Sequence, residues 1–153
     1  MQLSEHFSLS EATYSATAIR LGIDNMPSTL QLQNMKVTAQ GLELVRTALG
    51  HPIHIDSWLR LPLVNVAVGG SRISAHMDGF AADILCPDFG NPLAVCKAIV
   101  TAGIKFDQII HEYGEWTHIS FAPAMRGQLL TIFHPHKDYV SGLLTAEEYA
   151  KHF

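Results

Sequence analysis

Residues 74–84 of the chain read Ser-Ala-His-Met-Asp-Gly-Phe-Ala-Ala-Asp-Ile, and residues 115–120 read Glu-Trp-Thr-His-Ile-Ser. These two segments carry His76, Asp83 and His118. Two imidazoles and one carboxylate are typical of a catalytic zinc site, because a hydrolytic zinc keeps one coordination position open for water. A structural zinc is normally closed by four protein ligands. We therefore predict one zinc ion per chain, bound by these three residues.

The spacing of the first two ligands requires the chain to turn back. An extended segment of seven residues spans roughly 23 Å, whereas each ligand atom lies about 2 Å from its metal. Gly79 is placed to allow this turn. Side chains alternate along a strand, so Asp83 faces one side with apolar neighbours on the other, and His118 shares its face with Ser120. The pattern predicts two adjacent strands that present Asp83 and His118 to one metal.

A carboxylate beside the metal's water is the usual general base of such a site, since it takes the proton of the water and hands it to the departing amine. Glu115 precedes His118 by three residues, next to Gly114. On a regular strand this separation puts two side chains on opposite faces, but a turn brings them together. We predict Glu115 as the base. Glu112 is the alternative, although it ends a strand that reads as buried.

The pattern Ser-x-His-x6-Asp followed by Glu-x-x-His resembles the zinc peptidases of bacterial cell walls. These are the D-alanyl-D-alanine carboxypeptidases and dipeptidases, and the L-alanyl-D-glutamate endolysins of phages. The likeness extends over roughly residues 5–145 and is closest to the compact branch of the family. The segments that carry it, besides the ligands, are residues 7–11, 55–60, 64–70 and 106–110.

The resemblance implies zinc at His76, Asp83 and His118, with Glu115 as the catalytic base. It also implies that Arg60 is the cation that holds the substrate carbonyl or a carboxylate. Ser74 is expected to bind substrate or to satisfy the backbone of its own loop. The chain departs from the family at residues 58–59, where Trp-Leu stands before the arginine in place of a small residue and an aromatic one. We expect this departure to reshape the wall of the substrate pocket.

The function that the resemblance implies is hydrolysis of a peptide bond in the peptidoglycan stem, most closely that of a D-alanyl-D-alanine carboxypeptidase. Cleavage between L-Ala and D-Glu, as in phage endolysins, is the alternative within the family. A zinc-bearing binding module without catalysis is the alternative from another class, because the hedgehog signalling domain is similar in fold to these peptidases. A carboxylate at position 115 argues against that third interpretation.

Composition excludes several other classes of protein. The chain has 153 residues, which fits a single domain over 1–153, and its net charge of −4 leaves no basic cluster for nucleic acid. It contains no apolar run long enough to span a membrane and no signal peptide pattern, so we expect synthesis in the cytoplasm and action on the cell wall. A phage or prophage origin fits this expectation. The oligomeric state is left open.

The histidines and cysteines outside the zinc set are predicted to have no metal. His134-Pro135-His136 reads as an exposed turn, because a proline and then charged residues follow the first histidine. Cys86 and Cys96 are the only two cysteines, and they lack the spacing of a zinc thiolate pair. We expect both to be reduced thiols in apolar surroundings.

Hydrophobic periodicity and capping residues predict an α+β fold with helices packed on a mainly antiparallel sheet and the metal on its open face. The apolar stripe of the second helix is expected to be core. Its members are Leu30, Met35, Val37, Leu42, Leu44, Val45 and Leu49. Helices are expected at residues 8–22, 28–50 and 91–103, strands at 53–57, 80–85, 106–112, 117–122 and 129–134, and an irregular loop at 61–74.

Overall fold

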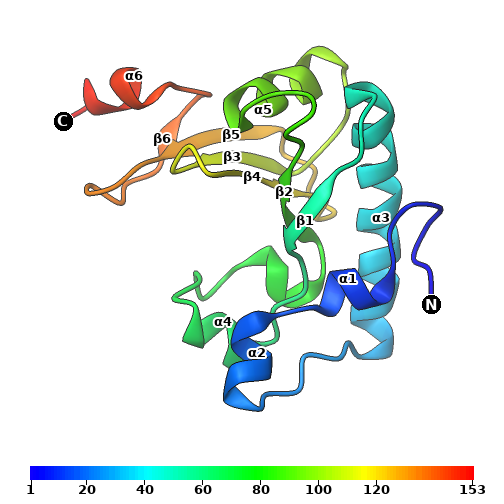
Figure 1. The fold of residues 1–153 in the computed structure, drawn as a ribbon. Coiled ribbons are helices and arrows are strands. Elements are labelled where there is room, and N and C mark those ends of the chain that lie inside the picture. Colours follow the sequence, from blue (N-terminus) through cyan, green and yellow to red (C-terminus); the bar gives the residue numbers. More distant parts are fainter.

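The computed structural model describes residues 1–153 and contains a six-stranded sheet with helices around it (Figure 1). The helices are α1 (Leu9–Thr13), α2 (Ala16–Leu21), α3 (Thr29–Leu49), α4 (Pro62–Ala67), the 3-10 helix η1 (Ala75–Asp78), α5 (Pro92–Thr101) and α6 (Ala146–Ala150). The strands are β1 (His54–Ser57), β2 (Ala81–Leu85), β3 (Gln108–Glu112), β4 (Trp116–Ser120), β5 (Gln128–Ile132) and β6 (Val140–Ser141). None of the helices combines the length and apolar character needed to cross a membrane.

The sheet is mixed, with the strand order β1-β2-β4-β3-β5-β6. All neighbouring strands are antiparallel except β3 and β5, which run parallel. The predicted α+β class with a mainly antiparallel sheet is therefore confirmed. The register pairs Asp83 of β2 with His118 of β4, and His118 with Ile110 of β3. Paired residues share a face of the sheet, so one face collects the polar side chains of three central strands.

The opposite face of the sheet packs on the long helix α3 and on α5. Ile84, Ile109 and Ile119 come from the three central strands and are completely buried there. They share one apolar cluster with residues of both helices, which include Met35, Leu42, Val45, Val95 and Ile99. Burial of apolar side chains in such a cluster is the main stabilising contribution in a domain. Figure 1 shows α3 beside the sheet, α1, α2 and α4 at the lower side of the view, and α6 beyond β6.

The predicted helix at residues 8–22 is wrong in one respect, because it is two short helices. Tyr14 has an extended backbone that ends α1, and the side chain of Ser15 then caps the first turn of α2. The carbonyl oxygens of Ala12 and Thr13 would accept helical hydrogen bonds in a continuous helix. They instead accept from the Leu59 N–H at 3.0 Å and from the amide of Asn25 at 2.9 Å. Contacts with distant segments thus take the acceptors that a longer helix needs.

Two further expectations require correction. The segment 61–74 is not wholly irregular, since Pro62 occupies the first turn of α4, a position that suits its fixed φ. The apolar stripe of α3 is only partly core: Met35, Leu42, Val45 and Leu49 are buried, whereas Leu30, Val37 and Leu44 are exposed. The helices predicted at 28–50 and 91–103, and the five strands, agree with the structure within about two residues.

Candidate metal centre

His76, Asp83 and His118 meet on the open face of the sheet. All three side chains are buried, and one potential ligand atom of each lies within 4.8 Å of the others. His76 lies in η1, which ends at Gly79 with a φ of 84°, and the chain then reverses into β2. The register of β2 and β4 brings Asp83 opposite His118. The turn at Gly79 and the pairing of the two ligand strands are as the sequence predicts.

The imidazole of His76 is oriented by a hydrogen bond to a group outside the cluster. The Nδ1–H of His76 donates to the carbonyl of Trp58 at 2.6 Å, which leaves its Nε2 facing Asp83 Oδ1 at 3.2 Å. His118 turns its Nδ1 to the same carboxylate oxygen at 3.0 Å. A second partner that fixes the tautomer and the angle of a histidine ring is the usual arrangement in metal sites. The donor set, with its free ring nitrogens around one carboxylate, fits zinc.

The electrostatics of the three side chains favour an ionised carboxylate. Burial alone would raise the pKa of Asp83, but the charge of His76 and the hydrogen bonds from both imidazoles outweigh it and lower that pKa. Burial lowers the pKa of His76, against the opposing influence of Asp83. For His118, burial also disfavours the charged ring, but the hydrogen bond and charge of Asp83 raise its pKa on balance. A deprotonated carboxylate is the form that binds a metal.

Of the two candidate bases, the fold brings Glu112 to the ligands and leaves Glu115 outside. Glu112 is the last residue of β3, its side chain is 16% exposed, and its Oε1 lies 3.6 Å from Nδ1 of His118. Glu115 stands in the three-residue turn between β3 and β4, where it is exposed and does not line the cleft around the ligands. The turn expected at Gly114 is present, but it points Glu115 into solvent.

The environment of Glu112 suits a proton acceptor. Burial raises its pKa to about 7, with a further contribution from the negative charge of Asp83. The charges of His118 and Arg60 act in the opposite direction. The indole N–H of Trp116 is close enough to lower this pKa as well, although it has no partner at good hydrogen-bond geometry. A carboxylate with a pKa near neutrality is matched to general acid–base work at neutral pH.

Arg60 enters the same cleft from the segment after β1. Its backbone N–H donates to the carbonyl of His76 at 3.0 Å, which holds the arginine next to η1. Its Nη2 lies 3.4 Å from Oγ of Ser74, and its Nε is buried without a partner. Ser74 in turn accepts the backbone N–H of His76 at 3.2 Å. The predicted site residues Arg60 and Ser74 thus stand together, with a guanidinium that has donors left for a ligand.

The expectation that residues 58–59 reshape the pocket wall is wrong. Trp58 and Leu59 are almost completely buried and do not line the cleft. The indole N–H of Trp58 donates to the carbonyl of Gly79 at 3.0 Å, and its ring packs edge-on against Phe7. The tryptophan therefore supports the turn beneath the ligands from the core side.

The cleft around the ligands has a volume of about 810 Å³ and runs along the open face of the sheet. One wall comes from the junction between α1 and α2 and from the loop 68–75, and the floor comes from β2, β4, β3 and β5. Tyr139, just before β6, completes the wall near Glu112. Nothing in the sequence pattern marks Tyr139, because the loop that carries it has no regular spacing relative to the metal ligands.

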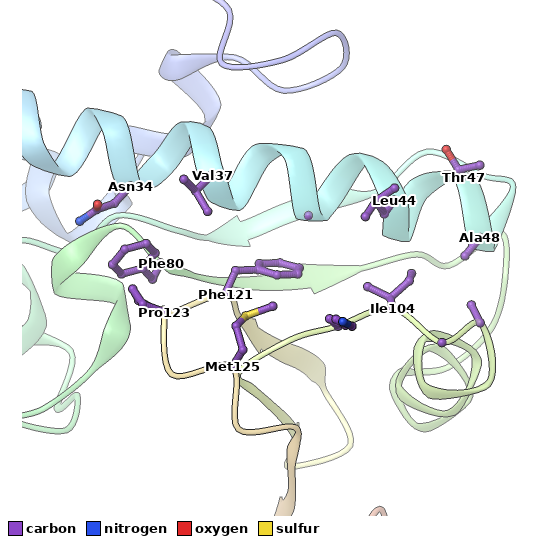
Figure 2. Close-up of a pocket in the computed structure, with 14 residues that line it drawn as sticks. Asn34, Val37, Leu44, Thr47, Ala48, Phe80, Ile104, Phe121, Pro123 and Met125 are labelled. Atoms are coloured by element: carbon purple, nitrogen blue, oxygen red, sulfur yellow. The ribbon is translucent and has the colours of Figure 1, made fainter.

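A second hollow, of about 980 Å³, lies away from the ligands (Figure 2). Val37 and Leu44 of α3 face Phe121 and Met125 across it, which explains why these two helix residues are exposed although they belong to an apolar stripe. Lys105 is the only charged residue among those that line this hollow. It therefore has none of the groups that hydrolysis requires.

The remaining histidines and cysteines stand apart from the cluster. His134 and His136 are exposed, and their rings stack on Tyr113 and Phe153 respectively. Cys86 and Cys96 are free and buried, as expected. No group of three ligand-type residues other than the central cluster comes together in the chain.

Comparison with protein families gives a match to the description "Peptidase M15" over residues 5–120. The matched range includes the three ligand-type residues, Arg60, Ser74 and Glu112. A search of curated proteins found no relative that matches the chain. A family match over this much of the chain, together with the His-Asp-His cluster in an open cleft, establishes that the chain is a peptidase M15 family member and hence of the hydrolase class.

Proposed function

We propose that the chain is a zinc metallopeptidase that cleaves a peptide bond of the peptidoglycan stem, of the D-alanyl-D-alanine carboxypeptidase type. One observation carries the proposal: three buried ligand-type side chains lie within 4.8 Å of one another, and two of them, Asp83 and His118, line a cleft that also holds Glu112 and Arg60. His76, Asp83 and His118 would hold one zinc ion per chain. Zinc, when bound, supplies Lewis acidity and lowers the pKa of a water molecule to about 7.

We assign the role of general base to Glu112 in place of Glu115. Its carboxylate is within 3.6 Å of a ligand ring, whereas Glu115 is exposed in the turn. In its ionised form Glu112 accepts a proton from the attacking water, and it then delivers this proton to the amine nitrogen as the peptide bond breaks. The pKa of about 7 lets the same group act first as base and then as acid near neutral pH.

Arg60 is the group that we assign to the substrate's oxygen atoms. A guanidinium offers planar pairs of N–H groups, so it holds a carboxylate or a developing oxyanion through two hydrogen bonds. Ser74 orients it through the contact at 3.4 Å. In a carboxypeptidase the terminal carboxylate of the substrate would need such a cation in the cleft. This requirement, and the presence of Arg60 beside the ligands, favour the carboxypeptidase type over an endopeptidase.

The decisive experiment incubates purified protein and zinc with defined muropeptides and identifies the products by mass. Loss of one D-Ala from a pentapeptide stem is the expected result. Release at the L-Ala–D-Glu bond would instead identify an endopeptidase. A protein that binds zinc but cleaves no stem peptide would be a binding module, and the proposal would fail.

The assignment of Glu112 is tested by Glu112→Gln, with Glu115→Gln as the matched control. Glutamine keeps the size of the side chain but accepts no proton, so Glu112→Gln should retain zinc and lose ~10²–10⁴-fold in kcat, the usual share of acid–base catalysis. Glu115→Gln should hydrolyse at the rate of the parent. The opposite result would return the base to Glu115. His76→Ala should lose tightly held zinc, because only two ligands then remain.

A further inference from the structure

A second cation lines the same cleft as the candidate metal centre. Arg60 and Arg126 are the only lysine or arginine residues among those that line it. Arg126 lies in the turn between β4 and β5, and its side chain is 53% exposed. Because Arg60 stands at the metal ligands, Arg126 is the group available to an anionic part of a substrate elsewhere in the cleft.

Asp107 fixes the direction of this guanidinium. Nε and Nη2 of Arg126 donate to the two oxygens of Asp107 at 3.0 and 2.8 Å, and the backbone N–H of Arg126 donates to Oδ1 at 3.1 Å. The hydroxyl of Ser120 lies 3.4 Å from Oδ2. Asp107 is buried, with 2% of its surface exposed. A carboxylate held in this way, just before the start of β3, gives the arginine one defined orientation.

Asp107 binds one edge of the Arg126 guanidinium, and the other edge is free. A guanidinium has five N–H donors, and the side-on pair uses one at Nε and one at Nη2. The parallel N–H groups of Nη1 and Nη2 form a second edge, which no group of the chain occupies. Two parallel N–H donors at this spacing match the two oxygens of a carboxylate. The free edge of Arg126 is therefore already oriented to donate two hydrogen bonds to a carboxylate of a ligand.

The sheet sets the distance between the candidate metal centre and Ser120, the strand residue next to Asp107. Ser120 follows His118 by two residues on β4, a rise of about 7 Å on the same face of the sheet. Ser120 pairs with Gln108 of β3, and Gln108 pairs with Gln128 of β5. The amide of Gln108 donates to Oε1 of Gln128 at 2.7 Å, so this row of the cleft floor is polar. An extended peptide advances about 3.3 Å per residue, so a substrate reaches this row about two residues from the scissile bond.

We propose that Arg126, held by Asp107, is a specificity-determining residue that binds a substrate carboxylate about two residues from the scissile bond. The proposal rests on the proposed peptidoglycan peptidase function and deepens it. In a stem of the order L-Ala, D-Glu, diamino acid, D-Ala, D-Ala, a cut between the two D-Ala residues leaves D-Glu two residues before the attacked one. Glutamate has two carboxyl groups and uses one in the peptide bond, so the other remains for Arg126.

Two synthetic pentapeptide stems test the proposal, identical except that the free carboxyl group of D-Glu is a carboxylate in one and a carboxamide in the other. The wild-type protein should cleave the carboxylate peptide with ~10-fold or higher kcat/KM, mainly through a lower KM, because a charge-assisted bidentate contact is lost in the amide. Arg126→Gln should cleave both peptides alike, at the rate that the wild type shows for the amide. Arg46→Gln, a change in the last turn of α3, should keep the wild-type preference.

Equal cleavage of the two peptides by the wild-type protein would overturn the inference and leave the peptidase function intact. If Arg126→Gln lowered kcat/KM by the same factor for both peptides, and so kept the wild-type preference, the inference would also be overturned. Arg126 would then only support the turn. Failure of the wild type to cleave either peptide would remove the proposed function and this inference together. The wild-type comparison needs no variant, so it decides the question even if Arg126→Gln does not fold.

Discussion

Arg60 combines two features that set it apart from a surface arginine. Its backbone is bonded to the segment that carries His76, and the Nε of its guanidinium is buried without a partner. A buried donor without a partner costs about 1–3 kcal/mol, which a bound ligand oxygen would recover. At the scale of the single residue, Arg60 is therefore the cation of the cleft whose buried donor lacks a partner until a substrate atom binds.

Arg60→Lys should lower kcat/KM for a stem pentapeptide by ~10²-fold, the scale of removing one oxyanion donor, because lysine offers a point charge in place of two parallel N–H groups. Zinc content and the unfolding midpoint should stay at parental values. Arg72→Lys is the control, since Arg72 is exposed and does not line the cleft. Steady-state kinetics on both variants check the prediction. Parental kinetics for Arg60→Lys would remove Arg60 from the site.

The cluster of His76, Asp83 and His118 was predictable from the sequence, but the acidic residue that lies beside it was not. The motif contains all three residues, and strand alternation puts Asp83 and His118 on one face; both are local properties of the sequence. The choice between Glu112 and Glu115 depends on where the hairpin turns. With a three-residue turn at 113–115, Glu112 pairs with Trp116 and so shares the face of His118. The face on which an acidic residue lies has to be counted through the strand pairs on either side of the turn. A count along one strand gives no answer, because Glu112 and His118 lie on different strands.

At the scale of elements, η1 and its exit turn position His76 and lead the chain into the strand that carries Asp83. Gly79 has a φ of 84°, and its carbonyl accepts from Thr38 Oγ1 at 2.9 Å and from Trp58 Nε1 at 3.0 Å. A Cβ at this position would lie 2.7 Å from Cγ of Met35 and 3.1 Å from the carbonyl of Gln31. The turn is thus pressed onto α3, and only glycine fits both the backbone and the space.

Gly79→Ala should lower the free energy of unfolding by ~1–3 kcal/mol, the cost of a strained φ, plus a contribution from the clash with α3, and it should also weaken zinc binding. Gly50→Ala separates the two causes, because Gly50 has a φ of 69° but nothing within 4 Å of a Cβ. In Gly50→Ala the free energy of unfolding should fall only by the cost of the strained backbone, and zinc affinity should be unchanged. Denaturant titration and competition with a zinc chelator measure both quantities. Equal losses in the two variants would show that packing against α3 is unimportant.

The elements themselves were predictable to different degrees. The helix at Thr29–Leu49 is long, capped by Ser28 and ended by Gly50, so its local signals agree with one another. The division between α1 and α2 depends on Asn25 and Leu59, which take two helix carbonyls from a distance in sequence. Propensity and capping describe neighbours along the chain, so hydrogen bonds of this kind are outside what such patterns predict.

At the scale of the whole molecule, the candidate metal centre joins elements that are distant in sequence. Its three side chains come from η1, β2 and β4, so an ion held by them would bind the folded chain and not the unfolded one. A ligand that binds only the native state raises its stability by ~4 kcal/mol at about 1,000 times its Kd. The sheet and the N-terminal helices would then unfold together at a higher temperature.

Removal of zinc with a strong chelator should therefore lower the unfolding temperature of the wild-type protein, and added zinc should restore it. His76→Ala should show a midpoint that is insensitive to chelator, because two ligands do not retain the ion. Calorimetry or thermal circular dichroism gives the midpoints. A wild-type midpoint that stays constant across chelator and zinc would mean that the cluster holds no ion in solution.

The two buried thiols can be used to follow unfolding of the whole chain, because they are accessible only when the core opens. Cys86 donates to the carbonyl of Pro52 at 3.4 Å, and Sγ of Cys96 lies 3.3 Å from Oγ1 of Thr117. Burial raises the pKa of Cys96 from 9.0 to about 11, because the thiolate would lose its hydration. The stability linked to this neutral thiol is present below pH 9 and is lost as the pH rises towards 11. Only the thiolate reacts with alkylating agents. The folded state therefore protects Cys96 in two ways: burial keeps the reagent away, and the raised pKa keeps the thiol neutral.

We expect neither thiol to react with iodoacetamide at about pH 8 while the chain is folded, and both to react once guanidinium chloride unfolds it. Cys86→Ser leaves Cys96 as the single thiol, so mass spectrometry of that variant reports the alkylation of Cys96 alone. Zinc should slow labelling further below the unfolding transition, because labelling of a buried thiol requires opening of the core, and zinc binding to the folded state makes opening rarer. Rapid alkylation of Cys96 in the native protein would mean that the sheet and α5 separate locally, without unfolding of the candidate metal centre.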